Sequence, residues 1–179
     1  MKYSSCLLAF VLSCFTTAWA CSPGEAQKSA VKATFQDDDA RLYICGDQVA
    51  SCSVDEFASK LKITPIALKR KTQATNAIKD GLLIEPLSPA KQTFSAVFLL
   101  ESCNYQLVFS PDVTQNDMVF LKKFSNDMPW IRSTVRESAD RLSQTDYAYS
   151  IAKKTYLVKN TKCFNFSDAG HLTPTRCNQ

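Results

Sequence analysis

Cysteine residues constrain the fold of this chain more strongly than any other feature. Eight are present, and six of them lie beyond residue 20: Cys21, Cys45, Cys52, Cys103, Cys163 and Cys177. An even set of cysteines in an oxidising compartment indicates disulfide bonds, and six cysteines allow fifteen connectivities. Short loops favour the pairs Cys45–Cys52 and Cys163–Cys177, which leaves Cys21 to pair with Cys103.

The N-terminus supports an oxidising compartment. Lys2 provides a positive charge, residues 6–15 form an apolar run, and Ala18-Trp19-Ala20 matches the small-residue site that signal peptidase cleaves. We therefore expect residues 1–20 to be a signal peptide and the mature protein to be exported, either periplasmic or secreted. The apolar run is shorter than the roughly 20 residues that cross a bilayer, and no later segment comes closer, so we expect no transmembrane segment.

Cys21 lies directly after the predicted cleavage site, which raises the alternative of a lipid anchor. The stretch Ala18-Trp19-Ala20-Cys21 resembles a bacterial lipobox only in the small residue before the cysteine, because Trp19 is bulky and the usual leucine is missing. We therefore favour an unmodified Cys21, which keeps the number of thiols available for disulfides even.

Length and charge limit the classes of function. Removal of residues 1–20 leaves 159 residues, enough for a single α+β domain spanning 21–179, with possible sub-lobes at 21–91 and 92–179. The proline-punctuated stretch 85–89 marks the change from the helix-containing part to the β-rich part. The mature chain has 20 basic and 17 acidic residues, and this net charge of +3 is too small to indicate nucleic-acid binding.

The helical signals lie within residues 41–86. Arg41–Cys45 is short and β-favouring, and the aspartates at 37–39 before it predict a loop. Ser53 and Glu56 form a capping box. The apolar residues that then share one helical face are Val54, Phe57, Ala58 and Leu61. Thr64-Pro65 predicts the start of a second helix that ends near Asn76, and Asp80-Gly81 turns the chain into an apolar strand.

The predicted order of strand, helix, helix and strand over residues 41–86 resembles a LysM module, a small βααβ domain that binds glycans containing N-acetylglucosamine. Phe57-Ala58 and residues 66–68 stand where that family places its helix-packing residues, and Gly46-Asp47 is similar to its early Gly-Asp. The resemblance implies a glycan groove near Asp47, Asn76, Lys79, Asp80 and Gly81. An ordinary helical hairpin packed on a sheet explains the same spacing.

Short apolar runs from Thr93 onward predict antiparallel strands. One predicted hairpin joins residues 94–100 to 105–109. Two more apolar strands follow at 118–121 and 130–135, and a second hairpin joins residues 147–151 to 156–158. Residues 126–163 resemble the closing β-meander of small uncharacterised bacterial periplasmic proteins, which share no function. Trp130 becomes a candidate for binding a sugar or a partner if it lies on an exposed face. The pattern predicts a disulfide-bonded α+β fold in which a helical hairpin packs against an antiparallel β-sheet.

Patterns for catalysis and metal binding are weak. His171 is the single histidine, and the cysteines lack paired C-x2-C spacing, so we predict no metal site. The four glycines are too dispersed for a phosphate-binding loop, and we predict no cofactor. Carboxylate pairs such as Asp112 with Asp117, or Glu137 with Asp140, leave open a glycoside hydrolase, although surface solvation explains them equally well. We predict no catalytic residue.

These observations predict an exported, non-catalytic binding protein of the cell envelope. The leading hypothesis is a protein partner, such as a wall-degrading enzyme that the protein inhibits or a toxin that it neutralises. The first alternative is binding of peptidoglycan or another N-acetylglucosamine glycan through residues 41–86. The second alternative is hydrolysis by a carboxylate pair.

Overall fold

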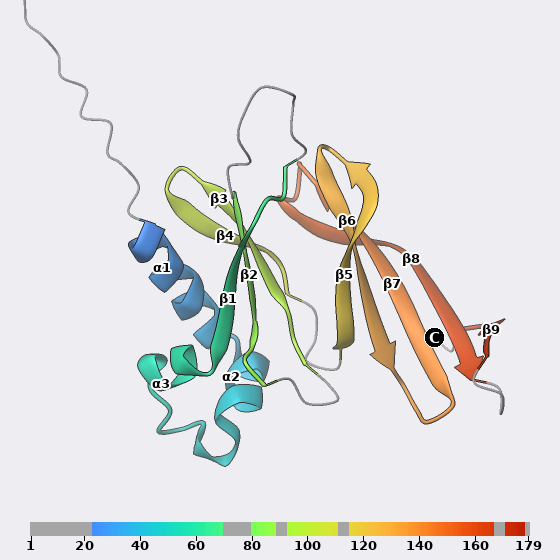
Figure 1. Cartoon of the computed structure of the whole chain (residues 1–179), viewed down its shortest axis with the longest axis horizontal. Helices are drawn as coiled ribbons and strands as arrows, with labels where there is room; N and C mark the ends of the chain where they lie inside the picture. Colours follow the sequence, from blue (N-terminus) through green and yellow to red (C-terminus); the bar gives the residue numbers. More distant parts are fainter. Residues whose placement is uncertain (1–22, 70–79, 89–92, 111–114, 167–170, 178–179) are drawn as a thin grey trace, which may run out of the picture.

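The computed structural model describes residues 23–69, 80–88, 93–110, 115–166 and 171–177 (Figure 1). The predicted signal peptide and Cys21 lie outside the described residues. The described helices are α1 (Pro23–Phe35), α2 (Asp38–Cys45), the 3-10 helix η1 (Gly46–Gln48) and α3 (Val54–Ser59). The described strands are β1 (Leu61–Ile66), β2 (Gly81–Pro86), β3 (Ala96–Glu101), β4 (Asn104–Phe109), β5 (Gln115–Ser125), β6 (Met128–Arg136), β7 (Arg141–Ser150), β8 (Thr155–Phe166) and β9 (Leu172–Thr175).

The described elements form three layers, with the helices on one side, one sheet in the middle and a second sheet on the far side (Figure 1). Sheet A has the strand order β1-β2-β3-β4, and sheet B has the order β5-β6-β7-β8-β9. All neighbouring strands are antiparallel, and the chain passes from sheet A to sheet B between Phe109 and Gln115. This arrangement confirms the predicted α+β class, although the short helices that cover sheet A match the predicted helical hairpin only loosely and the strands form two sheets.

The helices cover sheet A through a core of aromatic and aliphatic side chains. Phe57 of α3 and Phe98 of β3 are completely buried there. Phe35 of α1 packs edge-on against Phe57, with the ring centroids 5.4 Å apart. Burial of one such side chain contributes about 1.5–3 kcal/mol. This packing stabilises helices that are too short to persist alone in water.

A second core fills the space between the two sheets. Val97 of sheet A and Met128 and Ile131 of sheet B are almost completely buried there. Tyr156 of β8 lies in the same core, and its hydroxyl donates a 2.9 Å hydrogen bond to the carbonyl oxygen of Pro129. Burial raises the pKa of Tyr156, so the hydroxyl keeps its proton and remains a donor.

Tyr156→Phe is expected to lower the free energy of unfolding by about 1–2 kcal/mol, because the Pro129 carbonyl would lose its buried donor. Urea denaturation measures this change. Tyr105→Phe is the matched control, since the Tyr105 hydroxyl forms no hydrogen bond with a described residue. Its stability should stay within about 0.5 kcal/mol of the parent protein. Equal losses in the two variants would contradict the role assigned to the Tyr156 hydroxyl.

Residues 41–45 form the second half of α2, so the predicted strand at this place is wrong. The Asp37 side chain caps the helix by accepting a 2.9 Å hydrogen bond from the backbone N–H of Ala40. Asp38 and Asp39 occupy the first turn, where carboxylates interact favourably with the helix dipole. These aspartates start a helix and do not form the predicted loop, and their capping outweighs the β preference of the residues that follow.

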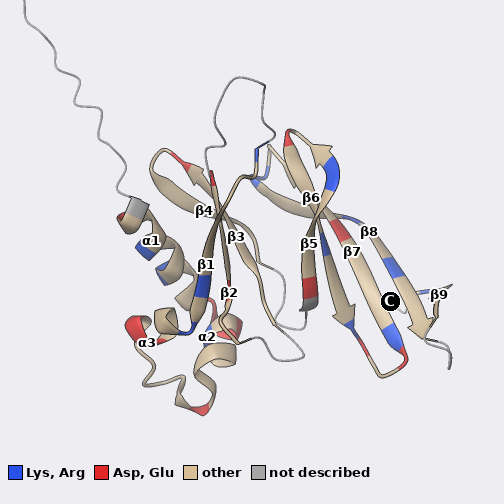
Figure 2. Cartoon of the chain, viewed as in Figure 1, with Lys and Arg blue, Asp and Glu red and all other residues tan. Residues whose placement is uncertain are grey.

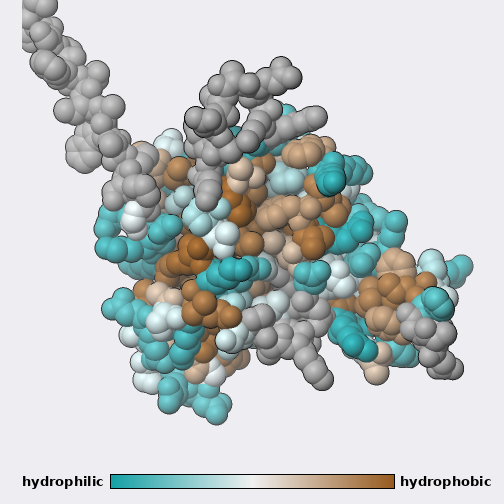
Figure 3. All heavy atoms as spheres, viewed as in Figure 1, coloured by the Kyte–Doolittle hydropathy of each residue, from teal (hydrophilic) through white to brown (hydrophobic). Residues whose placement is uncertain are grey.

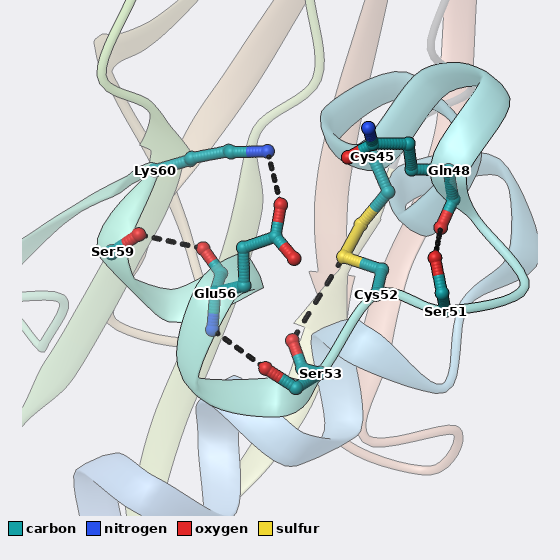
Figure 4. A network of polar contacts seen from close by, with 8 residues as sticks. All are labelled: Cys45, Gln48, Ser51, Cys52, Ser53, Glu56, Ser59 and Lys60. Carbon is teal, nitrogen blue, oxygen red and sulfur yellow. Dashed lines mark hydrogen bonds and ion pairs between the residues drawn. A yellow bond between two sulfur atoms is a disulfide. The ribbon is translucent and has the colours of Figure 1, made fainter.

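Ser53 begins α3 as predicted, because its hydroxyl accepts a 3.1 Å hydrogen bond from the backbone N–H of Glu56 (Figure 4). The Glu56 carboxylate pairs with Lys60 at 2.9 Å. Beside this cap, the disulfide between Cys45 and Cys52 ties the end of α2 to the segment that leads into α3 (Figure 4). The disulfide confirms the first predicted pair.

The predicted second helix is wrong in its first part, because Leu61–Ile66 forms strand β1. The predicted end of that helix, Asn76, lies outside the described residues. The β-branched side chains at 63, 64 and 66 favour an extended chain. Pro65 is tolerated because β1 is an edge strand that pairs only with β2 among the described strands. The described part of residues 41–86 therefore runs from helices into strands.

The predicted hairpins of the C-terminal half are confirmed. Ser102 and Cys103 join β3 to β4, and both have positive φ angles. Asn126 and Asp127 join β5 to β6 in the same way. Two-residue turns with this backbone conformation match the twist of antiparallel strands. The local turn chemistry therefore sets the register of each hairpin.

The second predicted disulfide, Cys163–Cys177, is also confirmed and ties β8 to the segment after β9. Cys103 is disulfide-bonded as well, and its predicted pairing with Cys21 involves a residue outside the described part of the chain. No helix among the described residues is long and apolar enough to cross a bilayer.

Candidate functional site

The two sheets are joined along one side, where β4 lies next to β8. The Thr155 hydroxyl donates a 2.8 Å hydrogen bond to the carbonyl oxygen of Val108. At the adjacent turns, the Lys154 ammonium pairs with the Glu101 carboxylate at 2.9 Å. These contacts link sheet B to sheet A and close this side of the sandwich.

On the opposite side the sheets leave an apolar groove between the end of β1 and strand β5. The groove has a volume of about 530 Å³ and is lined by Ile66, Ala67, Leu68, Lys69, Phe120, Leu121, Lys122, Phe124 and Pro129. Phe120 remains 36% exposed and Phe124 remains 42% exposed. Figure 3 shows apolar atoms gathered between the upper parts of β1 and β5. Exposed apolar side chains that gather at one place make the groove a candidate surface for binding another molecule.

A bulge in β5 brings three apolar side chains to this groove. Between the paired positions Phe120 and Phe124, residues 121–123 stand opposite a single residue, Trp130. The extra residues interrupt the alternation by which successive side chains of a strand point to opposite faces. Phe120, Leu121 and Phe124 can therefore all line the groove.

Asp80 holds the wall of the groove that follows β1. Its carboxylate accepts hydrogen bonds from the backbone N–H groups of Leu68, at 2.7 Å, and Lys69, at 3.2 Å. The Leu68 side chain is buried against Gly81, where an added Cβ would lie only 2.5 Å from the Leu68 Cδ1 atom. Asp80 and Gly81 therefore shape the groove wall through the backbone and the packing of Leu68.

Gly81→Ala is expected to displace the Leu68 side chain and to lower the free energy of unfolding by about 1–3 kcal/mol. Gly24→Ala is the matched control, because a Cβ at this position in α1 meets nothing within 4 Å. Alanine in a helix should raise stability by up to about 1 kcal/mol at that site. Thermal and urea unfolding measure both changes. A Gly81→Ala protein as stable as the parent would show that Leu68 is not confined as described.

The charge of the groove is positive. Lys69 and Lys122 are the charged residues of its lining, and the lining contains no carboxylate. Neither lysine forms an ion pair with another described residue. Figure 2 shows the basic segment of β5 in its upper part, whereas α2 and α3 carry acidic residues on the far side of sheet A. The lining of the groove therefore carries positive charge, with the Asp80 carboxylate behind one wall.

A second recess, of about 250 Å³, lies near the start of β1 and is more polar. Its charged lining residues are Lys62, Glu85 and Asp117. Lys62 and Glu85 are paired positions of β1 and β2, so both side chains lie on the same face of sheet A. The side of the sandwich between β1 and β5 is therefore polar near the start of β1 and apolar near its end.

The outer face of sheet B carries a charged cluster beside Trp130. Arg132 donates two hydrogen bonds to the Asp146 carboxylate, at 2.6 and 3.0 Å. The hydrogen bond from Arg132 lowers the pKa of Asp146, and the charges of Arg132, Lys162 and Lys123 lower it further. The Lys123 Nζ atom lies 3.4 Å from the centroid of the Trp130 ring. Lys123 therefore covers a ring face on which a sugar would stack.

Asp146→Asn is expected to cost about 1–2 kcal/mol of stability at pH 7, because the charged hydrogen bonds to Arg132 are lost. The pKa of Asp146 is lowered by folding, so its contribution is complete above the ordinary Asp pKa of about 3.9 and disappears as the pH falls through the lower folded value. Denaturation at pH 7 and at successively lower pH should therefore show a difference from the parent that shrinks as the pH falls through the folded pKa of Asp146. Asp47→Asn, at an exposed position, is the control. A difference that persists in acid would contradict this account.

The described residues among those predicted for binding do not form one site. Asp47 is exposed in η1, next to α2 at one end of sheet A, whereas Asp80 and Gly81 lie at the start of β2, at the other end (Figure 1). Trp130 lies on the outer face of sheet B. The remaining predicted residues, Asn76 and Lys79, lie outside the described residues.

The groove residues of β1 and β5 were not predicted from the sequence. Phe120 and Phe124 stand four residues apart with Lys122 and Lys123 between them. Strict alternation would place those two phenylalanines on one face, yet Leu121 breaks the pattern. Such a break within a strand is a signal of a bulge, and bulges are common next to functional sites.

The predicted carboxylate pair Glu137 and Asp140 lies in the exposed turn between β6 and β7. Glu137 pairs with Arg141 at 2.9 Å. A hydrogen bond from the Ser138 hydroxyl lowers the pKa of Asp140. A general acid for glycoside hydrolysis requires a raised pKa, so these contacts do not favour that role for Asp140.

The other candidates for chemistry are dispersed. Asp117 lines the second recess, whereas Asp112 lies outside the described residues. His171 is exposed directly before β9. Within the described ranges, no group of three or more histidine, cysteine, aspartate and glutamate side chains is arranged to hold a metal ion.

No protein family model, curated protein or solved structure matches this chain. A function for this chain is therefore inferred from the geometry of the molecule. Within the described residues, the groove between β1 and β5 combines the exposed phenylalanines, a shaped wall and two lysines in its lining.

Proposed function

We propose that this protein is an exported, non-catalytic binding protein of the cell envelope that holds an apolar, acidic segment of a protein partner in the groove between β1 and β5. The role fits an inhibitor or an immunity-type protein, whose task is to occupy another protein. The observation that carries the proposal is the open side of the sandwich, where Phe120 and Phe124 remain exposed beside a buried apolar floor.

The exposed phenylalanines supply the driving force for association. Complete burial of a phenylalanine side chain contributes about 1.5–3 kcal/mol relative to full exposure. Phe120 and Phe124 are each only partly exposed, so part of this free energy already contributes to the stability of the fold. A partner that covers both would gain the remainder together with the exposed part of Ile66. Large aromatic side chains are the usual anchors of protein interfaces.

The two lysines of the groove supply selectivity. Lys69 and Lys122 flank the apolar surface and have no carboxylate beside them in the lining. A partner segment with Asp or Glu next to its apolar residues would pair with them, whereas a basic segment would be repelled. Charge complementarity of this kind increases the rate of association and discriminates between partners.

The groove is largely preformed, which limits the entropic cost of binding. One wall is held by the Asp80 carboxylate through the backbone at 68 and 69. The helices and the Cys45–Cys52 disulfide support sheet A from the other face. A partner therefore meets a surface whose main chain is already in place.

The first test uses peptides selected from a randomised display library on the immobilised, oxidised protein. We expect the selected peptides to share apolar residues and at least one acidic residue. Phe124→Glu should weaken their binding at least about tenfold, because a buried charge replaces an apolar contact. Fluorescence anisotropy with labelled peptides measures the dissociation constants.

Ile151→Glu is the matched control, because Ile151 is 65% exposed in the turn between β7 and β8, away from the groove. Its peptide affinity should remain within about twofold of the parent. Failure to select any peptide, or equal affinity in the Phe124→Glu variant, would contradict the proposal. Sedimentation with isolated peptidoglycan provides a second comparison. Pelleting that N-acetylglucosamine oligomers abolish, and that Phe124→Glu leaves unchanged, would favour the glycan alternative instead.

A further inference from the structure

One edge of β1 pairs with no described strand, and the direction of its main-chain groups follows from the register of sheet A. The Leu87 N–H donates a 2.8 Å hydrogen bond to the carbonyl oxygen of Lys60, immediately before β1. In an antiparallel pair, residues alternate between bonding to the neighbouring strand and pointing away from it. With the register Lys62–Glu85 and Thr64–Leu83, the groups of Lys62, Thr64 and Ile66 therefore face β2. Those of Ile63 and Pro65 face outward.

The position of Pro65 agrees with this assignment. Proline has no N–H to donate, so within a sheet it is confined to places where that donor would face away from the neighbouring strand. The outward groups of β1 are then the N–H groups of Leu61 and Ile63 and the carbonyl oxygens of Leu61, Ile63 and Pro65. Among the described strands, β1 pairs with β2 alone. An edge of this kind is a template for one more strand.

Recesses lie on both faces of sheet A beside this edge. On the face toward sheet B is the apolar groove with Phe120 and Phe124. On the helix face a recess of about 300 Å³ is lined by Tyr43, Ile44, Ser59, Lys60, Pro86, Leu87 and Ser88. The recess on the helix face lies at the start of β1 and the groove lies at its end. Successive side chains of an extended strand point to opposite faces, so a strand that runs the length of β1 would direct one set of alternate side chains to the face with the groove and the other set to the face with the recess.

The edge of β5 is less suited to accept a strand. The bulge at residues 121–123 interrupts the regular spacing of its main-chain groups. Of the two strands that flank the groove, β1 therefore offers the more regular template.

We infer that the protein partner contributes an extended segment that adds to the edge of β1 facing away from β2 as a further strand of sheet A. Main-chain hydrogen bonds to Ile63 and Pro65 hold the segment, and one set of alternate side chains covers Phe120 and Phe124. An acidic residue of the segment pairs with Lys69 or Lys122. This mode resembles the strand addition that other peptide-binding domains use. The inference rests on the proposed function and specifies how the same groove is used.

The test uses the peptides from the display selection, synthesised with N-methyl groups on alternate backbone amides. If the peptide adds to β1 as a strand, N-methylation of one set of alternate amides should weaken its binding to the parent protein at least about tenfold. Each N-methyl group in that set removes a hydrogen bond to the β1 edge. The other set should change the affinity by less than about threefold, since its amides face away from β1. Equal effects of the two sets would overturn the inference.

Amide hydrogen exchange followed by NMR provides a second readout on the protein itself. The Ile63 amide should exchange rapidly in the free protein and become protected when an unmodified selected peptide is bound. The Thr64 amide, which faces β2, should be protected in both states. An Ile63 amide that stays unprotected in the bound state would also overturn the inference.

The two proposals fail in distinguishable ways. If Phe124→Glu abolishes peptide binding but the alternate N-methyl sets act equally, the groove binds a segment without strand addition. If Phe124→Glu leaves peptide affinity unchanged, the proposed function fails, whatever the methylation pattern shows.

Discussion

The packing of sheet A against sheet B along the β4 and β8 side is the contact on which the rest of the structure depends. Phe109, Tyr149 and Tyr156 form an edge-to-face aromatic cluster there, with ring centroids 5.6 and 5.9 Å apart. The Thr155 hydroxyl adds a hydrogen bond between the sheets. The open groove between β1 and β5 follows from where the two sheets are joined.

Local irregularities convert that open side into a candidate binding surface. The bulge in β5 directs Leu121 to the groove together with Phe120 and Phe124, which a regular strand would not do. On the other wall, the Asp80 carboxylate bonds to the backbone after β1, and Gly81 leaves room for Leu68. The bulge and the Asp80 contact each depart from regular strand pairing, and the surrounding hydrophobic cores hold these two segments in place.

Short-range signals explain which elements were predictable. The hairpins of the C-terminal half were predictable because apolar runs flank tight turns such as Ser102-Cys103. The start of α3 was predictable from the Ser53 cap. Residues 41–45 were misassigned because their β preference was weighed without the Asp37 cap. The segment from Thr64 was misassigned because Pro65 fits both the first turn of a helix and the edge of a sheet.

The sequence by itself determined the α+β class, the hairpins and the two short-loop disulfides, because each depends on residues close together along the chain. Only the tertiary structure decided that Ile66 and Phe124 line one groove and that Trp130 lies on the outer face under Lys123. More than fifty residues separate Ile66 from Phe124 in the sequence. Their proximity depends on how the two twisted sheets pack, and that packing is a property of the whole core that no local pattern encodes.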